Sequence, residues 1–199
     1  MIVEVEKEVR RSVIELMQMK KIALAKLFIP LGIAAAAILF FAFFVDPKMK
    51  GKFLTVLLAY MTPLGGPLIA APLGIALLTP VVYIAFIVFT DALFALFLVW
   101  NFDYTKKLPV IGKFVERLGE KGEETLEKHK WTKRLGFIGV VFLIMYPIAA
   151  GAGIGSVVGR LIGLSPLLTW IAVVLGTFLQ ATILVYSGLL IAFLIQLLY

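Results

Sequence analysis

Apolar residues along this chain gather into long runs that short charged stretches separate. The runs at 27–45, 80–100 and 167–198 hold at most one charged residue each. A helix needs about 20 apolar residues to cross a hydrocarbon core that is ~30 Å thick. The pattern therefore predicts three membrane-spanning helices, the last of them long enough to tilt or to bend near Gly176 or Gly188.

Proline and glycine interrupt two further apolar segments, 53–78 and 136–164. The first contains TPLGGPLIAAPLG at 62–74, with three prolines and three glycines, a composition that breaks a continuous helix. Irregular backbone at membrane depth is tolerated only where protein or a water-filled cavity satisfies its amides. We therefore expect two re-entrant hairpins, with tips at 62–74 and 146–155, that face each other across a cavity.

The distribution of basic residues distinguishes a topology in which all five apolar segments cross the membrane from one in which only three do. Six Lys and Arg residues lie in 1–26 and nine in 101–134, whereas the short polar loop DPKMKGK at 46–52 holds three. Five crossings would place the two most basic stretches on opposite sides. Three crossings with two re-entrant hairpins place both in the cytoplasm, which agrees with the positive-inside rule. We predict a multi-pass protein of the cell membrane whose N-terminus and residues 101–134 are cytoplasmic.

Helical spacing of apolar residues in the polar stretches predicts amphipathic helices at the membrane surface. These residues are Val5, Val9, Val13, Leu16 and Met17 in the first stretch, and Leu108, Ile111, Val115 and Leu118 in the second. Residues 1–26 are thus expected to form a cytoplasmic N-terminal helix, retained because no cleavage site follows it, and 27–199 the membrane domain. Within this domain a broken segment precedes an intact one twice, which is typical of transporters built from inverted halves.

Composition supports a membrane protein and excludes several other classes. Hydrophobic residues make up 62% of the chain and charged residues 16%, far from the balance of a soluble domain. The net charge of +7 does not indicate nucleic-acid binding, because the basic residues flank apolar runs and no aromatic RNA-binding motif accompanies them. With no cysteine and one histidine, His129 in a polar stretch, we expect no disulfide, metal, cofactor or enzymatic activity.

Two charged residues lie inside apolar segments. Asp91 is at the middle of the 80–100 run, where a carboxylate costs ~3 kcal/mol, so it should face the bundle interior. There it binds a proton or cation, or it only forms a packing hydrogen bond to a Thr, a Tyr or a hairpin amide. Arg160 suits a phosphate or carboxylate, or it extends to the cytoplasmic headgroups.

Other candidate residues surround the expected hairpin tips. Gly151, Gly155, Gly159 and Gly163 recur every fourth residue, which favours close helix packing over a surface for substrate. Thr177 and Gln180 lie one turn apart and either contact the cavity or join helices. The predicted substrate-binding residues are Asp91, Arg160, Gly65, Gly66, Pro67, Pro147, Gly151, Gly153 and Gln180.

The order of elements and several motifs resemble the small multidrug export family of prokaryotic membrane proteins. The likeness runs through most of 53–190 and is carried by APLGIALL, GFIGVVFLIMYP and GLSPLLTWIAVVLG. That family is itself similar to the DedA/VTT group. The resemblance implies an all-α integral membrane protein, a polytopic helical bundle with two facing re-entrant hairpins in an inverted-repeat, DedA-like arrangement. The family name implies drug export, and the DedA/VTT group implies movement of lipids between leaflets.

The leading hypothesis is a membrane transporter, or a lipid flippase or scramblase, that handles an anionic isoprenoid or phospholipid headgroup between the hairpins. Helix N-termini at the broken segments would favour an anion, with Arg160 assisting and Asp91 coupling a proton or cation. The alternatives are an efflux carrier for small hydrophobic cations, with Asp91 as countercharge, and a membrane scaffold without transport. The expected partners are membrane lipids, a small-molecule or lipid substrate and a second copy of the chain.

Overall fold

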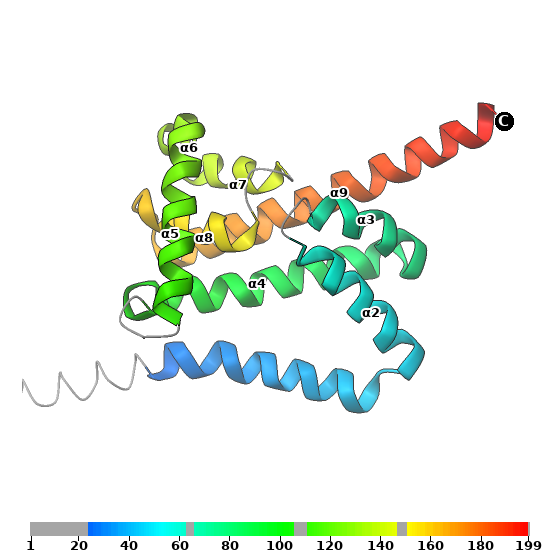
Figure 1. Ribbon diagram of the computed structural model, residues 1–199, viewed down its shortest axis with the longest axis horizontal. Coiled ribbons are helices and arrows are strands. Elements are labelled where there is room, and N and C mark those ends of the chain that lie inside the picture. Colours follow the sequence, from blue (N-terminus) through cyan, green and yellow to red (C-terminus); the bar gives the residue numbers. More distant parts are fainter. Residues whose placement is uncertain (1–23, 63–65, 106–110, 147–150, 199) are drawn as a thin grey trace, which may run out of the picture.

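The computed structural model describes residues 24–62, 66–105, 111–146 and 151–198, and all regular secondary structure in these ranges is helical. The first helix, Leu24–Phe44, precedes eight labelled helices (Figure 1). In chain order they are α2 (Pro47–Tyr60), α3 (Gly66–Leu77), α4 (Pro80–Thr105), α5 (Ile111–Lys128), α6 (Lys130–Leu135), α7 (Phe137–Met145), α8 (Ala152–Leu161) and α9 (Pro166–Leu198). The expected N-terminal helix 1–26 lies mostly outside the described residues.

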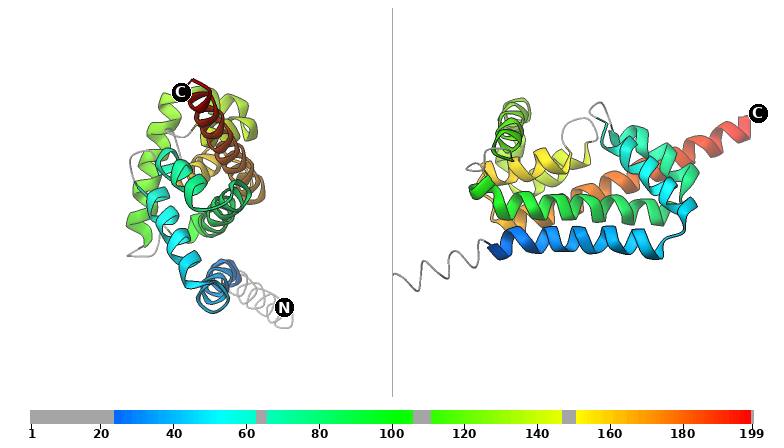
Figure 2. Two further views of the ribbon diagram at one scale, coloured as in Figure 1. Left: turned by 90° about the vertical axis from the view of Figure 1, so that its right-hand side faces the viewer. Right: turned by 60° about the horizontal axis from the view of Figure 1, so that its bottom comes forward.

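Three helices are long and apolar enough to cross a membrane, and they coincide with the three apolar runs from which the spans were predicted. Their apolar parts are Leu24–Phe44, Pro80–Phe102 and Pro166–Ile191. The first helix and α4 run antiparallel, because Asn101 Nδ2 donates to the Lys26 carbonyl at one end and the Phe41 and Phe86 rings meet at the other. Figures 1 and 2 show α9 packed across α4 as the third long helix. It is one uninterrupted helix, including Gly176 and Gly188.

Helix α2 begins earlier than the sequence predicts. The segment 46–52 was expected to be a polar loop, but α2 starts at Pro47 and includes most of it. Asp46 Oδ1 accepts a hydrogen bond from the Lys48 amide at 2.8 Å and so caps the helix. Proline is favoured in the first turn of a helix because its missing N–H has no intrahelical partner there. The prediction of a loop was therefore wrong, since it overlooked these two start signals.

The first hairpin turns over a shorter stretch than 62–74. Helix α3 is already formed at Gly66, so most of the expected tip is helical, and 63–65 lie outside the described residues. Pro67 is tolerated because it lies in the first turn of α3, whereas Pro72 lies inside the helix. Gly66 lies against the Tyr60 backbone carbonyl, where a Cβ atom would clash. A residue without a side chain thus allows α3 to start directly beside the end of α2.

Helices α7 and α8 form a second pair that turns back on itself. Gly136, with φ of 55°, forms the bend between α6 and α7. Gly163, with φ of 88°, follows the end of α8, and the Leu164 amide there donates to the Gly159 carbonyl at 3.0 Å. Both pairs pack on α9 and contact α4, and α9 contributes to the apolar core beside each of them.

Helix α5 crosses the bundle at one end in Figure 1. It packs on α8, where Gly122 lies close to the Val157 side chain. Polar and apolar residues segregate to opposite faces of α5, as expected for the amphipathic helix within 101–134.

Candidate functional site

Asp91 is buried in the middle of α4, with 4% of its surface exposed. Its Oδ2 atom accepts two hydrogen bonds, from Tyr60 Oη and from Thr177 Oγ1, both at 2.7 Å. Tyr60 is the last residue of α2, and Thr177 lies in α9. A carboxylate that is removed from water needs such donors to offset its desolvation. Asp91 therefore faces the bundle interior, as the sequence predicted, and it joins three helices.

Gln180 lies on α9, one turn beyond Thr177. Its Nε2 atom donates to the Ile144 carbonyl at 2.6 Å. Ile144 belongs to the last turn of α7, where backbone carbonyls lack intrahelical partners. Two neighbouring turns of α9 thus hold the inner ends of α2 and α7, the first through Asp91 and the second directly.

We call these groups the central polar cluster: the side chains of Tyr60, Asp91, Thr177 and Gln180 with the Ile144 carbonyl. The sequence placed Thr177 and Gln180 one turn apart and gave a hydrogen bond to a Thr or a Tyr as one alternative for Asp91, which the structure confirms, but it did not identify Thr177 as that partner. It missed Tyr60, whose only signal is a phenol two residues before the Thr-Pro break. The cluster is where the helices of both hairpins and two long helices meet.

Arg160 lies apart from this cluster. Its Nη1 atom donates to the Leu164 carbonyl at 3.0 Å, just beyond the end of α8, and its guanidinium carbon is 5.9 Å from the centre of the Phe102 ring. Phe102 follows Asp91 by 11 residues on α4, which corresponds to roughly 16 Å along a helix. The structure therefore places Arg160 near one end of the bundle, where it stabilises the end of α8.

The other predicted substrate-binding residues lie at the two helix breaks. Gly66 and Pro67 open α3, while Gly151 precedes α8 and Gly153 lies in its first turn. A Cβ atom on Gly153 would lie 3.1 Å from the Phe94 ring, whereas one on Gly151 would meet nothing within 4 Å. The remaining two, Gly65 and Pro147, lie outside the described residues.

The glycine stripe of α8 serves packing at two of its four positions. A Cβ atom on Gly155 would lie 2.5 Å from the Ile144 side chain, and one on Gly159 would lie 2.5 Å from Thr169 Cγ2. These two positions let α7 and α9 approach α8 closely. Gly151 and Gly163 meet no such neighbour, although Gly163 needs its positive φ.

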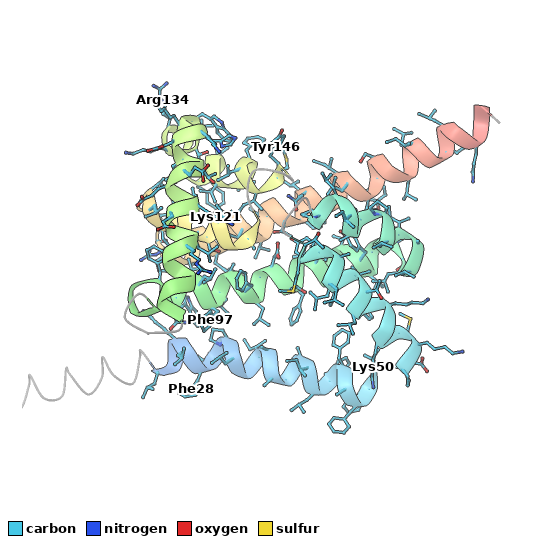
Figure 3. All side chains as sticks on the ribbon, in the orientation of Figure 1. Phe28, Lys50, Phe97, Lys121, Arg134 and Tyr146 are labelled. Carbon is cyan, nitrogen blue, oxygen red and sulfur yellow. The ribbon has the colours of Figure 1, made fainter. Side chains whose placement is uncertain are left out.

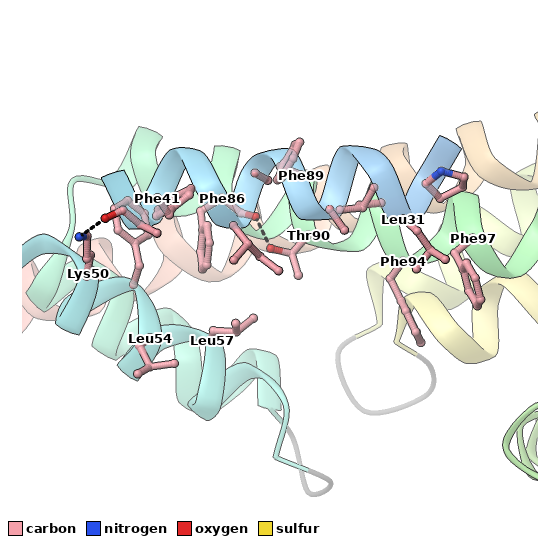
Figure 4. A pocket seen from close by; sticks show the side chains of 17 residues that line it. Leu31, Phe41, Lys50, Leu54, Leu57, Phe86, Phe89, Thr90, Phe94 and Phe97 are labelled. Atoms are coloured by element: carbon pink, nitrogen blue, oxygen red, sulfur yellow. Dashed lines mark hydrogen bonds between the residues drawn. The ribbon is translucent and has the colours of Figure 1, made fainter. Parts of the chain in front are cut away.

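A cavity of about 690 Å³ lies between the first helix and the rest of the bundle, and we call it the lateral groove. Its walls come from the first helix, α2 and α4, and Figure 4 shows phenylalanine side chains of α4 facing into it. The lining residues are Pro30, Leu31, Ala34, Ala37, Ile38, Phe41, Ala42, Lys50, Phe53, Leu54, Leu57, Phe86, Phe89, Thr90, Leu93, Phe94 and Phe97. No residue of the central polar cluster lines it.

A smaller, polar pocket of about 320 Å³ lies between α5 and the second hairpin. Its lining includes Lys121, Glu124, Lys128, His129 and Tyr146, of which Figure 3 labels the first and the last. Lys128 Nζ donates to Glu124 Oε1 at 2.7 Å, and this bond lowers the pKa of Glu124. Among the described residues, no group of three His, Asp or Glu side chains could hold a metal ion.

Three long apolar helices, two of which are joined by a buried polar cluster, define this chain as an integral membrane protein that is all-helical in its described residues. A family model described as "Putative small multi-drug export protein" matches residues 67–183, which is more than half of the 199 residues, and the chain belongs to this family. Membership of this family and the three long apolar helices together indicate a membrane transporter. Comparison with curated proteins and with solved structures gave no match.

Proposed function

We propose that the protein transports an amphipathic lipid with an anionic headgroup, an isoprenoid phosphate or a phospholipid, between the two leaflets. The observation that carries this proposal is the meeting of the two helix pairs on adjacent turns of α9. There the inner ends of α2 and α7 are held by hydrogen bonds to Asp91 and Gln180. Hydrogen bonds of this kind can be exchanged without unfolding a helix, so the two pairs can separate and close around a headgroup.

The arrangement of the breaks supports re-entrant hairpins. Helix α2 follows the end of the first helix and α3 precedes the start of α4, and these two ends adjoin through the contact of Phe41 with Phe86. A hairpin that begins and ends at one end of the bundle enters and leaves by one membrane face. The pair α7–α8 lies between α6 and the start of α9, towards the other end (Figure 1). An inverted pair of hairpins, related as in the DedA/VTT group, fits this order.

The helix directions favour an anionic group. Both α3 and α8 begin at the breaks, so their N-termini, the positive ends of their dipoles, lie at the inner side of each pair. Gly151 at the start of α8 carries no side chain to cap the helix. A phosphate can bind the amides at such helix starts. Arg160 assists by attracting headgroups at its end of the bundle.

A second candidate is an efflux carrier for small hydrophobic cations. The observation in its favour is that the described hydrogen-bond partners of Asp91 are hydroxyls rather than a base. A lipophilic cation could then neutralise the carboxylate. In neither case do we propose an enzymatic reaction or a cofactor.

Reconstitution into liposomes tests these functions. The purified protein should speed the transbilayer movement of fluorescent phosphatidylglycerol and of an isoprenyl phosphate more than that of phosphatidylcholine. Asp91→Asn should alter this rate, and Arg160→Ala should reduce it more than Arg160→Lys. Faster uptake of ethidium without lipid movement would establish the cation carrier instead. If neither lipids nor ethidium move faster than in protein-free liposomes, the protein is a scaffold and the transport proposal is wrong.

A further inference from the structure

The lateral groove lies between two antiparallel helices that line it with different side chains. The first helix contributes three alanines, Ala34, Ala37 and Ala42, among larger apolar residues, while α4 contributes mainly phenylalanine rings. In the most apolar stretch of each long helix, the buried share is only 6% for the first helix, against 28% for α4 and 44% for α9. The first helix is thus held at its ends and stands off from α4 between them.

Contacts at both ends keep the first helix in place. At one end Asn101 Nδ2 donates to the Lys26 carbonyl at 3.0 Å. At the other, Lys50 Nζ donates to the Ala42 carbonyl at 2.6 Å, and the Phe41 ring packs on Phe53. The space between these ends is therefore a feature of the fold rather than the result of a detached helix.

The groove has the dimensions and chemistry of a site for a hydrocarbon chain. Its volume of about 690 Å³ lies within the range of roughly 300–1,000 Å³ that is usual for small-ligand sites. On the first helix it extends from Pro30 to Ala42, which is roughly 18 Å at 1.5 Å per residue, or more than half of a ~30 Å core. The hydroxyl of Thr90, a polar residue in the lining, donates to the Phe86 carbonyl at 2.8 Å. The walls therefore offer an almost entirely apolar surface.

Charge is confined to one end of the groove. Of the described residues that line the groove, only Lys50 is charged. Figure 3 shows Lys50 at the end of the groove away from Phe28 and Phe97. Lys48 and Lys52 lie two residues to either side, in the first turns of α2. An ammonium group has three donors, so the bond from Lys50 to Ala42 leaves donors for a second acceptor. An apolar channel with a cationic end complements an anionic amphiphile.

We propose that the lateral groove binds the hydrocarbon chain of an anionic membrane lipid whose headgroup lies beside Lys48, Lys50 and Lys52. The inference rests on the proposed function and adds a binding site to it, since the groove would hold the lipid before or after transport. The first helix and α2, which form one wall, lie outside the stretch 67–183 that matches the family model, whereas α4, which forms the other wall, lies within it. The groove therefore joins the matched part of the chain to its N-terminal part.

Binding can be measured without transport by native mass spectrometry of the full-length protein released from detergent micelles. The probes are dimyristoyl phosphatidylglycerol and dimyristoyl phosphatidylcholine, which share chains and differ in charge. We expect one tightly retained phosphatidylglycerol, bound about fivefold more strongly than phosphatidylcholine, which is the effect of one lysine near the surface. Lys50→Gln should remove this preference, whereas Lys133→Gln, at an exposed position of α6, should not.

A bulky side chain in the groove tests its location. Ala37→Trp should abolish retention of the tight lipid, because Ala37 lines the groove. Ala36→Trp is the matched control, since Ala36 is the neighbouring residue, is exposed and does not line the groove. Should Ala37→Trp fail to fold, the comparison of Lys50→Gln with Lys133→Gln still decides the proposal.

Three results would overturn the inference. The first is equal retention of the two lipids, which means unselective filling by bulk lipid. The second is equal retention by the Ala37→Trp and Ala36→Trp variants. The third is a dimer that Ala37→Trp dissociates while lipid selectivity is unchanged, which means that a second copy covers the groove. Selective binding with no transport in liposomes would instead contradict the proposed function and leave the groove site standing.

Discussion

The Tyr60 hydroxyl donates a hydrogen bond to Asp91 Oδ2 at 2.7 Å, and this bond connects the end of α2 to the middle of α4. The same oxygen accepts from Thr177 on α9. One buried oxygen atom thereby fixes a helix break relative to two long helices. The position of the first hairpin depends on a side chain 31 residues away in the sequence.

Tyr60→Phe removes this donor and keeps the ring. We expect a loss of about 1–2 kcal/mol in the free energy of unfolding, because a buried carboxylate then lacks one of its donors. Unfolding by denaturant in mixed micelles measures the change. Tyr186→Phe is the control, since Tyr186 is 55% exposed. Equal effects of the two substitutions would show that the bond to Asp91 contributes nothing.

Thr177→Val tests whether the two hydroxyls act together on Asp91. Since both donate to the same oxygen, their removal should not be additive, and the double variant with Tyr60→Phe should differ from the sum by about 0.5 kcal/mol or more. The four unfolding free energies of the double-mutant cycle give this value. Strict additivity would mean that the two donors are independent.

Gln180→Met keeps the length of the side chain and removes the donor to the Ile144 carbonyl. The end of α7 should then open more readily, with faster amide hydrogen exchange in the last turn of α7 and a loss of about 1 kcal/mol in stability. Gln196→Met, at an exposed position near the end of α9, is the control. Unchanged exchange at α7 would contradict the anchoring role of Gln180.

Alanine substitutions along α8 test which of its glycines lie against a neighbouring side chain and which face open space. Gly155→Ala and Gly159→Ala should each destabilise the protein by about 1–3 kcal/mol, because the added methyl group would lie 2.5 Å from a neighbouring side chain. Gly151→Ala should be nearly neutral, since nothing lies within 4 Å of its Cβ position. Thermal unfolding in detergent checks the order. A uniform effect at all three positions would exclude close contact as the cause.

Single cysteines test the re-entrant topology, since the chain has none of its own. Lys48→Cys and Thr79→Cys flank the first hairpin, and Glu127→Cys and Ser165→Cys flank the second; all four positions are exposed. An impermeant thiol reagent should label each pair from one face, and the two pairs from opposite faces. Labelling of Lys48→Cys and Thr79→Cys from opposite faces would mean that the first hairpin crosses the membrane. Ser12→Cys should label from the same face as Glu127→Cys.

The sequence alone determined which segments are long apolar helices and that Asp91 must be inside. Both follow from local properties, the length of an uncharged run and the cost of a carboxylate in hydrocarbon. The two breaks were also evident, because proline and glycine act on the backbone where they occur, but the predicted stretches, 62–74 and 146–155, were too wide, since α3 begins at Gly66 and α8 at Ala152. The signals for the early start of α2 are equally local, because they are Asp46 as the N-cap and Pro47 as the first helical residue, but the sequence analysis overlooked them.

Only the tertiary structure decided which groups meet. Tyr60, Asp91 and Thr177 lie on three helices, and their hydrogen bonds span 31 and 86 residues of sequence, which no local pattern records. The lateral groove likewise depends on which face of the first helix meets which face of α4. Its lining combines side chains of the first helix, α2 and α4, so the hydropathy of any one helix does not reveal the groove.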